Sequence, residues 1–294
     1  RPFGDAGGVH FIIQADAASR RGLTQVLGVM NDLLSRIRAR FARNTSTPTG
    51  AELGRGFVYV PHDEEGSMAI AEPQLIVGRF TDEPPWIVVD HDTTSGIVAK
   101  WPGRLWEVEI LRKALQQPLP YAKYTRATAV RVLRELPLER LFEHGGSEIA
   151  QLLNRTGTLS EAQATKLSNG LSKEAAIAHD AVWDRWLQVA EPASPYIGQS
   201  HVGTLAIGSR SPRSPAGNAP SILCSVLSKR ARSLCGVAAF VADGEDETFA
   251  TPWSGAFQAL LHAVLGYGAT PALLREQERE QLTRAYQVAV SDDA

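Results

Sequence analysis

The chain has 294 residues, of which 44% are apolar and 21% charged, and its formal net charge is −2. These values are typical of a globular protein with one large domain or two ordinary ones, and they exclude the disordered and fibrous classes. A near-neutral total produces no global field that would attract nucleic acid or an anionic membrane. We therefore expect neither nucleic acid nor a membrane among the partners.

Signals for targeting and for an oxidising environment are few. The longest apolar runs are far below the roughly 20 residues that a membrane-spanning helix needs, and the first residues lack the pattern of a signal peptide. The two cysteines, Cys224 and Cys235, are too few for a disulfide framework. These observations favour a soluble protein of a reducing, cytoplasmic compartment.

The first predicted elements are a short strand at residues 9–13 and a long helix at residues 17–43. In the helix, apolar residues recur at steps of three and four from Leu23 to Phe41, which places one apolar stripe along it. The apolar segments that follow are short, rich in β-branched residues and separated by turn residues, as is typical of strands. These predicted strands lie at residues 57–60, 74–77, 86–89, 97–101 and 105–110.

The connections between these strands are short, which favours antiparallel neighbours, since parallel neighbours need a crossover of a dozen residues or more. We therefore expect a meander, in which sequential strands pair, with the long helix packed on one face of the sheet. In the segment 105–110, charged and apolar residues alternate around Trp106. This strand should have one face on the core and the other largely in solvent.

The helical period returns after Pro118, and it predicts a series of helices with two short strands, at residues 204–207 and 237–241. Ser147 and Ser160 stand where N-caps belong. The predicted helices lie at residues 127–136, 138–142, 147–154, 160–167, 173–189, 221–234, 253–265 and 272–290.

The expected fold class is therefore α+β. An N-terminal antiparallel sheet with one long packed helix is followed by a helix-rich C-terminal part with a few short strands. The division falls near residue 117 and gives a region 1–117 and a region 118–294. A single core shared by both regions is compatible with the sequence.

Catalytic motifs of known spacing are absent, because no GxxxxGK[ST], HExxH, CxxC or GxSxG occurs. Histidine beside aspartate is the remaining signal. In Asp90-His91-Asp92 the imidazole ends an apolar strand, and imidazole with carboxylate can act as a base and its orienting partner or bind a metal. Asp90, His91 and the distant His201 are the candidate catalytic residues, and a solvated turn is the alternative interpretation.

A second His-Asp doublet, His179-Asp180, lies on a predicted helix. The segment from Ala175 to Asp180 resembles the helix of HD-type phosphohydrolases, in which such a doublet and outlying His and Asp residues bind metal. The resemblance covers about six residues, and Ala181 begins a stretch without the glycine and lysine that usually follow. Neighbours on a helix point about 100° apart, so we expect these two side chains not to pair and assign no metal ligands.

Two basic clusters suit an anionic ligand, because guanidinium groups recognise phosphate and carboxylate. Arg36, Arg40 and Arg43 lie on the long helix, and Arg210 and Arg213 lie in a Ser-, Pro- and Gly-rich loop. Lys229, Arg230 and Arg232 follow that loop. The first five arginines are the candidate ligand-binding residues, with a solvated face as the alternative interpretation.

Two function classes stay open. The first is a non-catalytic binding or regulatory protein with a protein partner or self-association through its long helices; it is favoured because no catalytic signature stands out. The second is a His/Asp-based hydrolase, either metal-dependent or metal-free. The sequence identifies no cofactor.

Overall fold

The computed structural model describes residues 54–62, 68, 71–78, 81–96, 98, 100–118, 122–189, 214–243 and 246–291. The chain divides into two units at residue 52, and every described residue belongs to the second unit, Leu53–Ala294. Antiparallel sheets and helices both occur in it, which confirms the α+β class. The strands predicted at 9–13 and 204–207 and the long helix at 17–43 lie outside the described residues.

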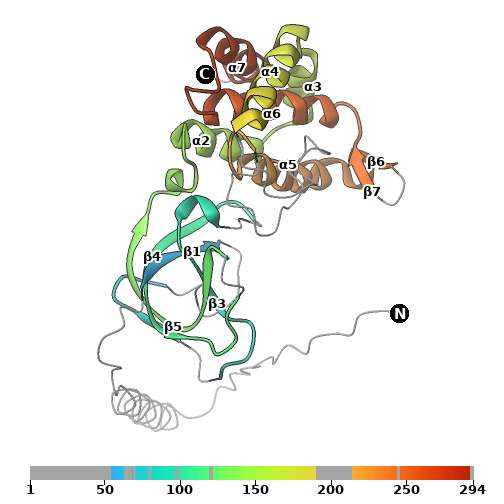
Figure 1. The fold of residues 1–294 in the computed structure, drawn as a ribbon. Coiled ribbons are helices and arrows are strands. Elements are labelled where there is room, and N and C mark those ends of the chain that lie inside the picture. Colours follow the sequence, from blue (N-terminus) through green and yellow to red (C-terminus); the bar gives the residue numbers. More distant parts are fainter. Residues whose placement is uncertain are drawn as a thin grey trace, which may run out of the picture. The chain divides into compact units, whose positions relative to one another are not determined.

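Five strands form one sheet that closes into a small barrel (Figure 1). The longest strand, β5, pairs with β4 along one edge and with β3 and then β2 along the other. β1 lies between β4 and β3 and closes the ring. The strands are β1 (Arg55–Pro61), β2 (Ile76–Gly78), β3 (Ile87–Asp90), β4 (Gly103–Lys113) and β5 (Tyr124–Leu136).

All pairings in the barrel are antiparallel, as the short connections predicted. The predicted meander is wrong, because the strand order is β2-β5-β3-β1-β4. The segment 127–136, predicted to be a helix, belongs to β5 instead. The segment 97–101 has no strand among its described residues.

Successive side chains of a strand point to opposite faces, so every second residue of these strands points into the barrel. Val58 and Val60 of β1 point inward with Trp106 and Val108 of β4, and all four are nearly inaccessible to solvent. The outer face of β4 and β5 carries ion pairs, as expected for the solvent-facing side of the predicted strand 105–110. These pairs are Arg104–Glu135, Arg134–Glu107 and Arg131–Glu109.

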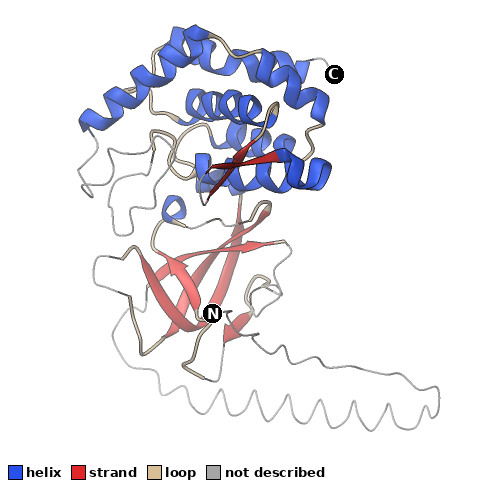
Figure 2. Ribbon diagram, turned by 90° about the vertical axis from the view of Figure 1, so that its right-hand side faces the viewer, coloured by secondary structure: helices blue, strands red, loops and turns tan. Residues whose placement is uncertain are grey.

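The remaining described chain is mostly helical (Figure 2). Ser160 begins α3 with a capping box to Gln163, as predicted, but the N-cap of α2 is Gly145 and not Ser147. The segment predicted as a helix at 138–142 contains a 3-10 helix, Leu138–Leu141. In the segment predicted as a strand at 237–241, the 3-10 helix Gly236–Ala239 comes first and the strand begins at Phe240. The helices are α2 (Gly146–Thr156), α3 (Glu161–Asn169), α4 (Lys173–Val189), α5 (Ala219–Cys235), α6 (Trp253–Gly268) and α7 (Glu276–Ser291), with a hairpin of β6 (Phe240–Asp243) and β7 (Asp246–Phe249).

The core of the helical part is built around α6, whose apolar residues cover most of its circumference. Such a helix is stable only when it is surrounded by other elements, and α6 packs against α2, α3, α5 and α7. The same apolar cluster continues onto Val98, Trp101 and Leu105. The indole N–H of Trp101 donates to Asn154 Oδ1 of α2 at 2.9 Å. The barrel and the helices therefore share apolar and polar contacts, and the predicted division at residue 117 stays a prediction.

Candidate functional site

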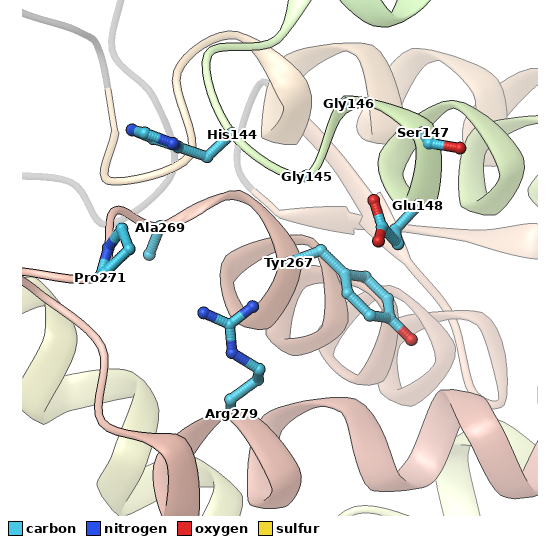
Figure 3. Close-up of a pocket in the computed structure, with 9 residues that line it drawn as sticks. All are labelled: His144, Gly145, Gly146, Ser147, Glu148, Tyr267, Ala269, Pro271 and Arg279. Carbon is cyan, nitrogen blue, oxygen red and sulfur yellow. The ribbon is translucent and has the colours of Figure 1, made fainter.

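A pocket of about 480 Å³ lies where the start of α2 meets the end of α6 and the start of α7. Small-molecule sites in proteins typically have volumes of roughly 300–1,000 Å³. Its lining combines one arginine, one histidine, one glutamate and one tyrosine with smaller residues. The lining residues are His144, Gly145, Gly146, Ser147, Glu148, Tyr267, Ala269, Pro271 and Arg279 (Figure 3).

Two glycines bring the start of α2 close to its neighbours. Gly145 has φ 55° and ψ 30°, the left-handed conformation that side chains disfavour. A Cβ atom at Gly145 would collide with the carbonyl oxygen of Tyr267, and one at Gly146 would collide with that of Glu139. The turn therefore needs glycine at both positions in order to carry the first turn of α2 to the pocket.

The first turn of α2 offers unpaired donors. The first helical hydrogen bond runs from Ile149 N to Gly145 O, and Gly145 supplies no side-chain cap. Among the described residues, no hydrogen bond uses the N–H groups of Gly146, Ser147 or Glu148. Such groups carry the positive end of the helix dipole and form a natural place for an anion.

Arg279 of α7 supplies a full positive charge to the same pocket. Figure 3 shows its guanidinium directed toward the turn at Gly145, with Tyr267 on one side and Ala269 and Pro271 on the other. Its Nε is buried and has no hydrogen-bond partner among the described residues. It forms an ion pair at 3.5 Å with Oε2 of Glu276, whose side chain is 79% exposed, but no hydrogen bond. A buried donor without a partner is costly, about 1–3 kcal/mol or more for a charged group.

The other polar groups limit what the pocket can hold. Burial raises the pKa of Tyr267, against the effect of a hydrogen bond with Gln287, so its phenol stays protonated at neutral pH. Glu148 is the only carboxylate among the described residues of the lining, and its charge acts on Tyr267 (Figure 3). The pocket thus has a basic side at Arg279 and the α2 terminus, and an acidic point at Glu148. This arrangement is suited to holding a charged group rather than to moving a proton between two tuned carboxylates.

The predicted catalytic residues Asp90 and His91 are adjacent on β3 but have different surroundings. The Nε2 atom of His91 lies 2.9 Å from Thr125 Oγ1 at an exposed edge of the barrel. The Asp90 carboxyl is half-buried, forms no hydrogen bond or ion pair with a described residue, and burial raises its pKa to about 7. The two side chains form no mutual hydrogen bond, and His201 lies outside the described residues. Their catalytic roles stay predictions.

The expectation that His179 and Asp180 do not pair is wrong. The Nδ1 atom of His179 lies 3.2 Å from Asp180 Oδ1, and its Nε2 atom accepts a hydrogen bond from the indole N–H of Trp183 at 3.0 Å. This arrangement fits a neutral imidazole that carries its proton on Nδ1. Among the described residues, no group of three or more His, Cys, Asp or Glu side chains could hold a metal ion.

Sequence reasoning missed His262 of α6, whose ring centroid lies 5.1 Å from that of His179. Burial, followed by the neighbouring His179, lowers the pKa of His262 from 6.5 to about 4, and Asp180 acts in the opposite direction. His262 is the one histidine in a predominantly apolar helix. That position was the only signal in the sequence.

The five predicted ligand-binding arginines, Arg36, Arg40, Arg43, Arg210 and Arg213, lie outside the described residues. Two basic residues that follow the second cluster have structural contacts. Arg230 donates to the carbonyl of Leu159, and Arg232 pairs with Glu247.

Comparison with known proteins adds no identification, since no family model, curated protein or solved structure matches the chain. Within the described residues, none of the helices combines the length and the apolar character needed to cross a bilayer.

Proposed function

We propose that the protein is a binding protein whose pocket at the start of α2 takes up a small ligand with a carboxylate or phosphate group. The observation that carries this proposal is the buried Nε–H of Arg279, which has no hydrogen-bond partner among the described residues and borders the pocket. An unsatisfied buried donor calls for an explanation such as a ligand. An anion in the pocket would accept hydrogen bonds from this N–H and from the backbone N–H groups in the first turn of α2.

The sign of the local charge supports an anion over a neutral ligand. The guanidinium of Arg279 and the α2 terminus act together, and both favour negative charge. Glu148 repels a second negative charge on the side of Tyr267. The ligand's remaining part should therefore be neutral or cationic.

This proposal belongs to the first of the two function classes, a binding or regulatory protein. A protein partner, self-association, cytoplasmic location and the hydrolase alternative stay predictions. The sequence suggested that arginines bind an anionic ligand, and the proposal keeps this chemistry. The arginine in the proposed site is Arg279 of α7, which was not among those predicted.

Thermal unfolding with inorganic phosphate and with acetate tests the proposal, with sodium chloride at matched ionic strength as reference. Phosphate, acetate or both should raise the Tm, because a ligand that binds only the folded state stabilises it. Arg279→Gln should bind at least about tenfold more weakly, since a charge-assisted hydrogen bond contributes roughly 1.5–3 kcal/mol. The anion that stabilises more identifies the class of ligand.

The matched control is Arg284→Gln, which removes the same charge from an exposed position on the same helix. It should keep the response of the unmodified protein. The proposal is wrong if neither anion stabilises the protein more than chloride does, or if both variants respond equally.

A further inference from the structure

The loop at residues 92–96 connects the barrel to the helical part through specific hydrogen bonds. The side-chain amide of Asn218, at the start of α5, donates to the carbonyl oxygens of Thr94 and Gly96, each at 2.9 Å. Asp92 fixes the loop internally by accepting from Thr94 N at 2.8 Å. One residue, Asn218, therefore holds this loop against α5.

Asp90 precedes this loop at the closing seam of the barrel. It is paired with Phe57, the single register pair between β3 and β1. The loop folds back on its carboxyl, because a Cβ atom at Gly96 would lie 3.0 Å from Asp90 Oδ2. Gly96 thus lies beside the carboxyl, and its carbonyl oxygen accepts a hydrogen bond from Asn218. Hydration of the side of the carboxyl that Gly96 covers therefore requires the loop to move.

We propose that Asp90 and the 92–96 loop form a pH-sensitive connection, in which ionisation of the Asp90 carboxyl lifts Gly96 and breaks the hydrogen bonds of Asn218. A carboxylate without a partner in a partly buried site gains free energy from fuller hydration, and hydration on the side of Gly96 requires the loop to move. At lower pH the carboxyl is neutral and the loop stays closed. The inference is independent of the pocket at the start of α2.

No neighbouring positive charge stabilises the ionised Asp90 carboxyl. Burial alone accounts for the rise in the pKa of Asp90 to about 7, with no contribution from a neighbouring charge. The titratable groups on its own segment are His91 and Asp92. Those on β1, on β5 with the residue before it, and on the 3-10 helix Leu138–Leu141 are Arg55, Tyr59, Lys123, Tyr124, Arg126, Arg131, Arg134, Glu135, Glu139 and Arg140. The transition therefore falls near neutral pH, where small changes of pH alter the population of the ionised form.

NMR spectroscopy of the full chain between pH 5.5 and 8.5 tests the proposal. The Asn218 side-chain amide signals should move with a midpoint near pH 7, together with the ¹³C signal of the Asp90 carboxyl in the same sample. The change should be absent in Asp90→Asn, which keeps the shape and cannot ionise. Asp92→Asn is the matched control and should keep the transition, because an asparagine oxygen can still cap Thr94.

Two results would overturn the proposal. One is an Asp90 carboxyl signal that titrates near its usual value of about 4. The other is an Asn218 signal that does not follow the Asp90 titration in the unmodified protein or that still moves in Asp90→Asn. The titration of the unmodified protein decides the question even if Asp90→Asn does not fold.

Discussion

His262 should make the folded state sensitive to acid. Its side chain is only 9% exposed within the apolar core around α6, and burial lowers its pKa from 6.5 to about 4. The folded state therefore favours the neutral imidazole, whereas the unfolded chain takes up a proton near pH 6.5. The stabilisation that results is fully present above pH 6.5 and is lost as the pH falls toward 4.

The size of the effect follows from the difference between the two pKa values. Each unit of difference corresponds to about 1.4 kcal/mol. The free energy of unfolding should fall by about 2 kcal/mol between pH 7.5 and pH 5, and by about 3 kcal/mol at pH 4, through this one group. Asp90 acts with the opposite sign, because its raised pKa gives stability at low pH that is lost as the pH rises through 7.

The assay is urea unfolding at several pH values between 7.5 and 4, compared between the unmodified protein and His262→Leu. The variant has a buried side chain of similar volume that cannot ionise, so its unfolding free energy should decline less toward pH 4, by about 3 kcal/mol. Comparing the two proteins removes the contribution of Asp90. His62→Leu is the control for the loss of a histidine, because His62 is exposed. Equal acid sensitivity in His262→Leu and the unmodified protein would refute the reasoning.

Two further predictions concern the framework and are measured as free energies of unfolding in urea. Asn154→Ala leaves the buried indole N–H of Trp101 without its acceptor and should cost about 1–3 kcal/mol, whereas Asn154→Asp keeps an acceptor oxygen and should cost less; equal costs would contradict this role. Ser160→Ala removes the cap of α3 and should cost about 1 kcal/mol, and Ser160→Asp should recover most of it. A neutral effect of Ser160→Ala would show that the capping box contributes nothing.

Much of the fold could be predicted from local patterns. The helix α4 has the predicted bounds, and β1, β3 and β4 lie within a few residues of prediction, because their periodicity is local. β5 was mistaken for a helix, because Ala127, Arg131 and Leu133 are good helix formers. Pairing with three other strands decides its structure instead. Such non-local contacts, which also close the barrel, leave no periodic signal in one segment.

The pocket could not be predicted, because its parts are distant in the sequence. Gly145-Gly146 before a helix was visible as a break between helices, but not as a turn packed against Tyr267. Arg279 has the appearance of an ordinary charged residue on an exposed helix face. Its significance comes from the buried Nε, which has no hydrogen-bond partner among the described residues and depends on the packing of α7 against α6.

The Nε–H signal of Arg279 in ¹H–¹⁵N NMR spectra offers the most direct test of the anion-binding pocket. Titration with inorganic phosphate and with acetate at constant ionic strength should shift this signal and the backbone signals of Gly146 and Ser147 with one common dissociation constant. If these three signals stay in place with both anions, or move only as they do with added chloride, the pocket does not bind an anionic group.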